Sequence, residues 1–147
     1  MGHVAFADPF CGAFGKIITE EIGKQGLTVH TGPRAALPHG QPGPVTIKPG
    51  DTVIVCQNGV FGGRMKENVE RAGGKAVMVE DPWGRAVDPG KVEDALKANP
   101  DAKILAFVHA ETSTGAISDA ATLADLARQH DCLTIVDTVT SLGGSPL

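Results

Sequence analysis

The fold class is decided by residues 103–144, which read KILAFVHAETSTGAISDAATLADLARQHDCLTIVDTVTSLGG. This stretch holds two apolar runs, 104–108 and 133–136, and each is followed by a polar, glycine-containing loop. Such runs are typical of parallel strands in an α/β sheet, and these sheets bind ligands at the carboxyl ends of their strands. Asp137 directly follows the second run and is therefore placed for chemistry.

The same alternation extends upstream. After Pro49-Gly50, apolar and β-branched runs alternate with segments whose apolar residues recur at helical spacing. The order β, α, β, α, β, α, β predicts an α/β fold, with a mainly parallel sheet and helices on both faces. The expected strands are 52–56, 76–79, 104–108 and 133–136. The first expected helix is 63–72, and the second begins at Asp88-Pro89 and ends at Asn99-Pro100. The third is capped by Ser118 and carries Leu123, Leu126 and Ala127.

Residues 1–47 lack this alternation, and we expect them to form an N-terminal part that precedes a domain over residues 48–147. Apolar positions between residues 15 and 23 are spaced for a short amphipathic helix, which Gly26 can end. Residues 28–45 are rich in proline, glycine and histidine and show neither the strand nor the helix period. We expect an irregular connection there.

Composition narrows the classes of function. A formal net charge of -4 and a pI near 5.7 offer no basic surface for nucleic acid. No apolar run approaches the ~20 residues that cross a bilayer, so no membrane partner is expected. Three cysteines without close pairing indicate a reducing, cytoplasmic location. The five histidines lack zinc-site spacing, and most of them are expected at the surface or at caps, so no metal is expected.

Three loops are expected to share the carboxyl edge of the sheet, at 57–63, 109–115 and 137–144. Asp137 leaves an apolar strand, so it either faces a positive partner or only caps the next turn. Phe61 lies among glycines and is either a ring that stacks on a flat ligand or a core side chain. The sequence by itself leaves both alternatives open.

The loop at 109–115 reads HAETSTG and gathers three hydroxyls beside a glycine that can adopt a left-handed turn. This arrangement suits recognition of a phenolic or phosphate oxygen, although hydroxyls in front of a helix also serve as caps. Trp83 follows the second expected strand, and we expect it to shield the sheet edge rather than to contact a ligand.

The chain contains, in this order, the motifs NGVFGGR at 58–64, WG at 83–84, VDP at 87–89, HAETSTG at 109–115 and VDTVTSLGG at 136–144. Together they resemble the motifs of the class V, pyridoxal-phosphate-dependent aminotransferases. The resemblance covers residues 48–147 and is closest to the alanine–glyoxylate and serine–glyoxylate (serine–pyruvate) aminotransferases. It implies part of the large domain of a fold type I enzyme, a homodimer that moves an amino group from an amino acid, alanine or serine, to glyoxylate or another 2-oxo acid.

The resemblance also implies a role for each candidate site residue, with pyridoxal 5′-phosphate as the cofactor. Asp137 matches the aspartate that pairs with the pyridine nitrogen, which would supply its positive partner. Phe61 matches the aromatic position that stacks on the ring, where related enzymes often have tryptophan. Thr112 matches the hydroxyl that bonds near the phenolic oxygen.

Two features of the family pattern are absent. The family lysine that forms a Schiff base with the cofactor follows the aspartate by a couple of dozen residues, beyond Leu147, and none of the eight lysines present matches it. We therefore assign no catalytic residue and expect the chain alone to be inactive. The family's Ser-Gly-x-Gly phosphate turn is also missing from residues 28–45, which leads to the hypothesis that this stretch is out of frame.

Two alternatives remain beside a transaminase fragment. One is a non-catalytic, truncated paralogue that at most pairs with other subunits. The other is a dinucleotide-binding module, because a glycine loop between a strand and a helix also begins such domains. The spacing of Gly59, Gly62 and Gly63 does not give G-x-G-x-x-G, which disfavours the second alternative.

Overall fold

The computed structural model describes residues 3–6, 28–31 and 47–145, and the chain divides into two compact units, Met1–Thr46 and Ile47–Leu147. In the first unit, β1 (His3–Phe6) pairs in parallel with β2 (Thr28–Thr31). The prediction of an irregular connection is therefore wrong for residues 28–31, where β-branched residues favour an extended backbone. The helix expected at 15–23 lies outside the described residues, as does the remainder of the irregular segment up to residue 45.

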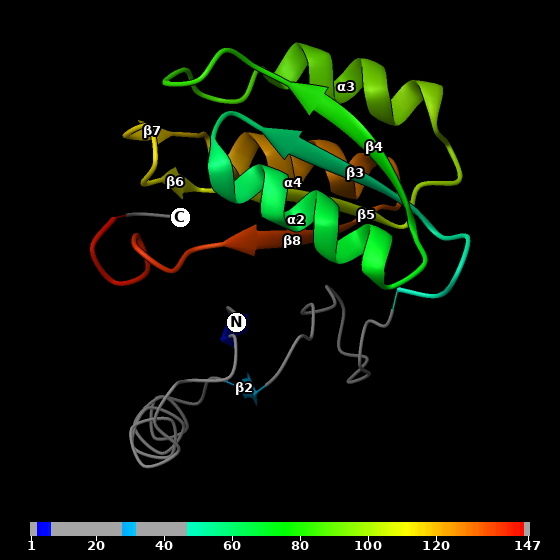
Figure 1. The fold of residues 1–147 in the computed structure, drawn as a ribbon, viewed down its shortest axis with the longest axis horizontal. Coiled ribbons are helices and arrows are strands. Elements are labelled where there is room, and N and C mark those ends of the chain that lie inside the picture. The colour runs from blue at the N-terminus through cyan, green and yellow to red at the C-terminus, as the bar shows by residue number, and fades with distance from the viewer. Residues whose placement is uncertain (1–2, 7–27, 32–46, 146–147) are drawn as a thin grey trace. The chain divides into compact units, whose positions relative to one another are not determined.

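The second unit is built on a sheet of four parallel strands in the order β4-β3-β5-β8 (Figure 1). This confirms the predicted sheet, and each expected strand lies within the observed one. All four strands point the same way, so their carboxyl ends meet at one edge, on the left of Figure 1. The strands are β3 (Thr52–Gln57), β4 (Lys75–Glu80), β5 (Ile104–Val108) and β8 (Leu133–Asp137).

Helices lie on both faces of this sheet, as predicted (Figure 1). Helix α2 (Val60–Arg71) covers one face, and α3 (Pro89–Ala98) and α4 (Ala120–Gln129) pack together on the other. A short antiparallel hairpin, β6 (Ala110–Glu111) and β7 (Ala116–Ile117), follows β5 and was not expected. No helix in the described part of the chain is long and apolar enough to span a membrane.

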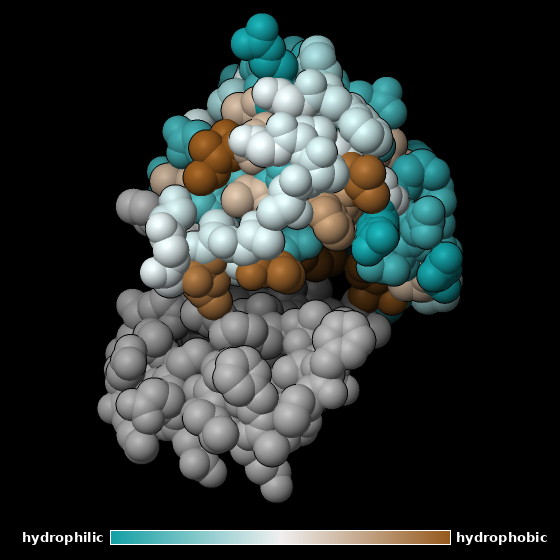
Figure 2. Space-filling model, turned by 60° about the vertical axis from the view of Figure 1, so that its left-hand side comes forward, coloured by the Kyte–Doolittle hydropathy of each residue, from teal (hydrophilic) through white to brown (hydrophobic). Residues whose placement is uncertain are grey.

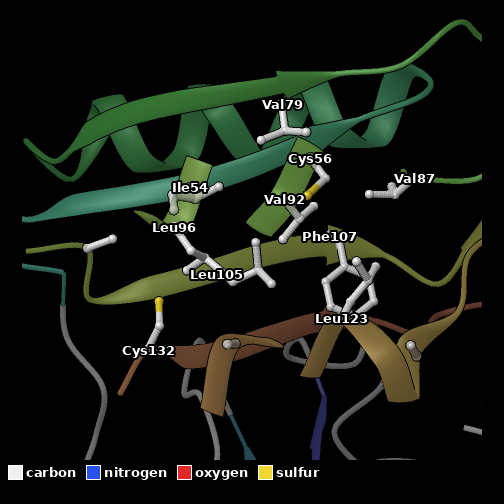
Figure 3. Close-up of a cluster of buried hydrophobic side chains, with 13 residues drawn as sticks. Ile54, Cys56, Val79, Val87, Val92, Leu96, Leu105, Phe107, Leu123 and Cys132 are labelled. Carbon is white, nitrogen blue, oxygen red and sulfur yellow. The ribbon is translucent and has the colours of Figure 1, made fainter. Parts of the chain in front are cut away.

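The main core lies between the sheet and the pair α3 and α4 (Figure 3). Side chains alternate across a strand, so Ile54 and Cys56 of β3 face this core, while Val53 and Val55 face the side of α2. Burial raises the pKa of the Cys56 thiol to about 12 and that of Cys132 to about 11. Both thiols therefore stay protonated and behave as small apolar side chains.

The starts of α3 and α4 are set by aspartates that lie next to them in the sequence. Asp88 caps α3 by accepting from the Gly90 N–H at 2.8 Å, with a proline at the first helical position, as the sequence predicted. The predicted Ser118 cap of α4 is wrong. Asp119 takes that position and accepts from the Thr122 N–H, whereas Ser118 Oγ accepts from Val87 N and joins two loops.

Helix α2 begins at Val60, earlier than the expected start at residue 63, so its first turn contains two glycines. A Cβ on Gly62 would lie 2.6 Å from the Cys56 carbonyl oxygen and 2.8 Å from Gln57 Cα. Glycine at this position therefore lets the helix approach the backbone of β3 closely.

Candidate functional site

Three segments meet at the carboxyl edge of the sheet: the start of α2, the β6–β7 hairpin and the loop that follows β8. They contain the loops that the sequence analysis assigned to this edge. Hydrogen bonds join the hairpin to both of the other segments, so it lies at the centre of the candidate site.

The link between the hairpin and α2 is Glu111, whose side chain is fully buried. Its Oε2 accepts from Phe61 N at 3.1 Å and from Gly62 N at 3.4 Å, while its Oε1 accepts from Ser113 N at 3.2 Å and Ser113 Oγ at 2.5 Å. Ser113 Oγ in turn accepts from Val60 N at 3.0 Å. Glu111 and Ser113 thus take the first three N–H groups of α2, which have no partner within the helix.

Gly59 makes this arrangement possible. It precedes α2 and has no side chain to cap the helix, and a Cβ there would lie 2.4 Å from Glu111 Cγ. A side chain at this position would collide with the glutamate that replaces the local cap. Nothing in the sequence indicates this role, because Glu111 lies 50 positions beyond Phe61.

Phe61 lies in the first turn of α2 and is half-buried. The Arg64 guanidinium is 5.1 Å from the centroid of its ring, within cation–π range. One face of the ring is therefore covered by a side chain one turn along the same helix.

Asp137 ends β8 and is half-buried. Its Oδ1 accepts from Val139 N at 3.1 Å, which is the turn-capping contact that the sequence analysis left open. Within residues 47–145, no Lys or Arg nitrogen forms an ion pair with this carboxylate within 4.0 Å. A positive partner for Asp137 would therefore have to come from elsewhere, such as a bound ligand.

The hairpin is also bonded to the loop that contains Asp137. His109 N donates to the Asp137 carbonyl at 3.0 Å, and Thr140 Oγ1 donates to the Ala110 carbonyl at 3.1 Å. His109 is buried, and its Nδ1 lies 2.8 Å from Ser141 Oγ, which is buried as well. His109 is therefore an exception to the expectation that most histidines lie at the surface or at caps; its position directly after a fully buried strand was the signal for burial.

Thr112 is exposed between the two residues that cap α2. The third hydroxyl of the loop, Thr114 Oγ1, donates to the Asn58 carbonyl at 3.3 Å. The structure therefore fixes the backbone on both sides of Thr112 and leaves its own side chain open to solvent. That is the arrangement needed for a hydroxyl that contacts a ligand.

Exposed apolar side chains gather in the segments at this edge. Trp83 is 61% exposed, so most of its surface faces solvent rather than the sheet it was expected to shield. Figure 2 brings this side of the molecule forward and shows separate apolar patches among neutral and hydrophilic residues. The other large exposed hydrophobic residues in the described part of the chain are Val60, Ile117, Val139 and Leu142.

Comparison with known proteins gives a consistent result. The sequence profile of the family described as Aminotransferase class-V matches residues 19–147. An uncharacterized aminotransferase of Methanocaldococcus jannaschii is 39% identical over 98 residues, which are 67% of this chain and 26% of that protein. The (S)-ureidoglycine–glyoxylate transaminase of Bacillus subtilis is 39% identical over 99 residues, which are 67% of this chain and 23% of that protein.

A solved structure agrees with these relatives. The crystal structure of alanine–glyoxylate aminotransferase from Nostoc sp. superposes with a TM-score of 0.65 at 39% identity, and the match covers 69% of this chain and 27% of that one. The chain thus spans about a quarter of the length of the proteins it matches.

Proposed function

The chain belongs to the class-V aminotransferase family, whose members are pyridoxal 5′-phosphate enzymes of fold type I, and from that premise we propose that its carboxyl edge is part of a transaminase cofactor site. The proposed reaction of the whole protein moves an amino group from alanine or serine to glyoxylate or another 2-oxo acid. Glyoxylate stands in the names of relatives from Bacillus subtilis and Nostoc sp., which supports it as the acceptor.

The observation that carries the proposal is the position of the β6–β7 hairpin. The hairpin contains Thr112 and is hydrogen-bonded to the turn of α2 that contains Phe61. His109, which directly precedes the hairpin, is hydrogen-bonded to the backbone of Asp137. Three residues that are far apart in the sequence thus belong to segments joined at one sheet edge. This supports a single site that uses all three.

In this proposal each residue holds a different part of the cofactor ring. When bound, the cofactor supplies a protonated pyridine that acts as an electron sink. Asp137 keeps the proton on the ring nitrogen, and its bond to Val139 N fixes the orientation of the carboxylate while leaving Oδ2 for this contact. Phe61 stacks on the ring through the face that Arg64 does not cover. The Thr112 hydroxyl donates to the phenolic oxygen.

The described residues fit the ring of the cofactor but not its phosphate. Helix N-termini commonly bind phosphate, and α2 begins at this edge. Its first N–H groups are already bonded to the Glu111 carboxylate and the Ser113 hydroxyl, and a second anion there would face the buried carboxylate. We therefore propose that the start of α2 does not bind the phosphate. The same occupied helix terminus disfavours a dinucleotide, whose pyrophosphate would need it.

No lysine in the described part of the chain is placed to react with the cofactor. Three lie at the amino ends of strands, at the opposite edge of the sheet, and three form ion pairs with acidic side chains. We therefore propose that the carboxyl edge binds the cofactor ring but that no described lysine supplies the catalytic amine. The chain alone would then not turn over. The first three are Lys48, Lys75 and Lys103, and the others are Lys66, Lys91 and Lys97.

Pyridoxine 5′-phosphate tests the binding proposal, because it has an alcohol in place of the aldehyde and cannot react with surface lysines. We expect saturable binding by fluorescence titration of the chain. Asp137→Ala should weaken binding about tenfold, because it removes a charge-assisted hydrogen bond. Asp125→Ala, an exposed acid on α4, is the control and should leave binding unchanged.

Two results would contradict the proposal: a wild-type chain that does not bind the probe, or equal binding by the wild type and Asp137→Ala. The inactivity of the chain is tested separately with pyridoxal 5′-phosphate and borohydride. We expect scattered, inefficient modification of surface lysines. Efficient reduction at a single lysine would show that the chain supplies its own reactive amine.

A further inference from the structure

Glu111 is a buried carboxylate that the proposed chemistry does not use. No Lys or Arg nitrogen in residues 47–145 forms an ion pair with it. Burying an unpaired carboxylate is costly, so its hydrogen bonds must offset the loss of water. Its four donors come from two segments, two N–H groups of α2 and the N–H and hydroxyl of Ser113.

The bonds of Glu111 do more than cap a helix. A serine or aspartate at position 59 would satisfy the same N–H groups from within the sequence of α2. Glu111 instead satisfies them from the hairpin, and Gly59 provides the space that this requires. The two oxygens of one carboxylate thereby join the backbone at Phe61 to the backbone at Ser113.

We propose that Glu111 is a positioning residue for the cofactor ring, an inference that rests on the proposed function. Its Oε2 holds the backbone of Phe61, and its Oε1 holds the residue that follows Thr112. The aromatic that stacks on the ring and the hydroxyl that contacts its phenolic oxygen are therefore kept at a fixed separation before any ligand binds. Preorganisation of this kind removes the ordering cost from the binding step.

A double-mutant cycle tests whether Glu111 acts through Phe61. Glu111→Gln keeps the shape of the side chain, but its amide NH₂ must face N–H or hydroxyl donors on one of the two sides. We expect it to weaken binding of pyridoxine 5′-phosphate about fivefold in the wild-type background, the effect of one lost hydrogen bond. In the Phe61→Ala background, Glu111→Gln should cause a clearly smaller loss of affinity, because it then acts only through the residue that follows Thr112.

The measurement separates positioning from stability. Thermal unfolding of each variant reports the structural cost. This cost should remain at full size in the Phe61→Ala background, whereas the loss of affinity should be clearly smaller there. The absorption and fluorescence spectra of the bound probe report whether it still stacks. Glu67→Gln is the matched control, because it makes the same change at an exposed position on α2 and should leave both affinity and spectra unchanged.

A second variant covers the case in which Glu111→Gln does not fold. Ser113 is exposed, and Ser113→Ala removes its hydroxyl. This hydroxyl donates to Glu111 and accepts from Val60 N. The variant should weaken binding about twofold to threefold, and by less in the Phe61→Ala background.

The outcomes distinguish the two proposals. Two results would overturn the positioning role and leave the cofactor site intact. In the first, Glu111→Gln weakens binding by the same factor with and without Phe61. In the second, Glu111→Gln and Ser113→Ala both bind the probe with wild-type affinity. Absence of binding by the wild-type chain would overturn the proposed function itself, and the positioning role with it.

Discussion

The helices on the two faces of the sheet begin in different ways. On one face, α3 and α4 start with aspartates that cap them from the adjacent position in the sequence, Asp88 and Asp119. On the other face, α2 starts at a glycine, and its first N–H groups are bonded to Glu111 and Ser113, about 50 positions away. The helix that contributes to the candidate site is thus the one whose start depends on tertiary structure.

The helices also differ in what they bury. Large apolar side chains of α3 and α4, such as Leu96 and Leu123, lie in the main core, whereas α2 buries only Gly62 and Val69. Packing therefore holds α3 and α4, while close backbone approach and a buried carboxylate hold α2. A helix held in this way ties its position to the hairpin, and the hairpin carries Thr112. Local caps and apolar packing would not create that link.

The largest effect is expected on the packed face. Leu123→Ala removes a side chain that is fully buried between α4 and the sheet, and it should destabilise the domain by about 3 kcal/mol through lost burial and a residual cavity. Urea unfolding measures this loss. Leu126→Ala, at a half-buried position of the same helix, is the control and should cost clearly less. Equal losses would mean that α4 is not held by its buried stripe.

A smaller effect is expected on the face of α2. Gly62→Ala places a methyl group 2.6 Å from the Cys56 carbonyl oxygen, so α2 has to move away from β3, and we expect a loss of about 2 kcal/mol. Gly63→Ala is the matched control, because its Cβ would meet only the flexible end of Gln57 at 3.3 Å. It should be neutral or stabilising, since alanine favours helix more than glycine does.

Urea unfolding of both glycine variants, together with titration with pyridoxine 5′-phosphate, sharpens the comparison. Displacement of α2 also moves Phe61, so Gly62→Ala should lose affinity as well as stability. If Gly62→Ala were as stable as Gly63→Ala, close approach to the strand would not be what holds α2.

The features that the sequence predicted are those whose cause is local. The strand at 104–108 and the start of α3 at Asp88-Pro89 have the observed bounds, because a continuous apolar run and a cap followed by proline are visible in the sequence. The early start of α2 was missed because its cap lies in another segment. The hairpin was missed because each of its strands has only two residues, too few to show a period.

The candidate site divides in the same way. Phe61, Thr112 and Asp137 were assigned from residue types and family motifs, and their roles remain predictions. Glu111 and His109 were not assigned, because burial of a charged or polar side chain depends on donors supplied by distant segments. The sequence therefore indicated which side chains can face a ligand, but not which ones hold those side chains in place.

The smallest effect is expected at the local cap of α4. Hydrogen bonds donated by the Thr122 backbone and hydroxyl lower the pKa of Asp119 below its ordinary value of 3.8. A lowered pKa in the folded state contributes stability above pH 3.8, and this is lost as the pH falls through the folded-state pKa. Asp119→Ala should therefore lower the Tm slightly at neutral pH, and the difference from wild type should shrink in acid.

Asp119→Asn separates the cap from the charge. Asparagine caps a helix about as well as aspartate but does not titrate, so this variant should keep the Tm at neutral pH and lose less of it on acidification than the wild type does. Thermal unfolding from neutral pH to below pH 3.8 measures both effects. If the wild type and Asp119→Asn had the same pH dependence, the charge of Asp119 would contribute nothing to the cap. The contrast with α2 would then lie only in the distance between cap and helix, and not in the ionic character of the cap.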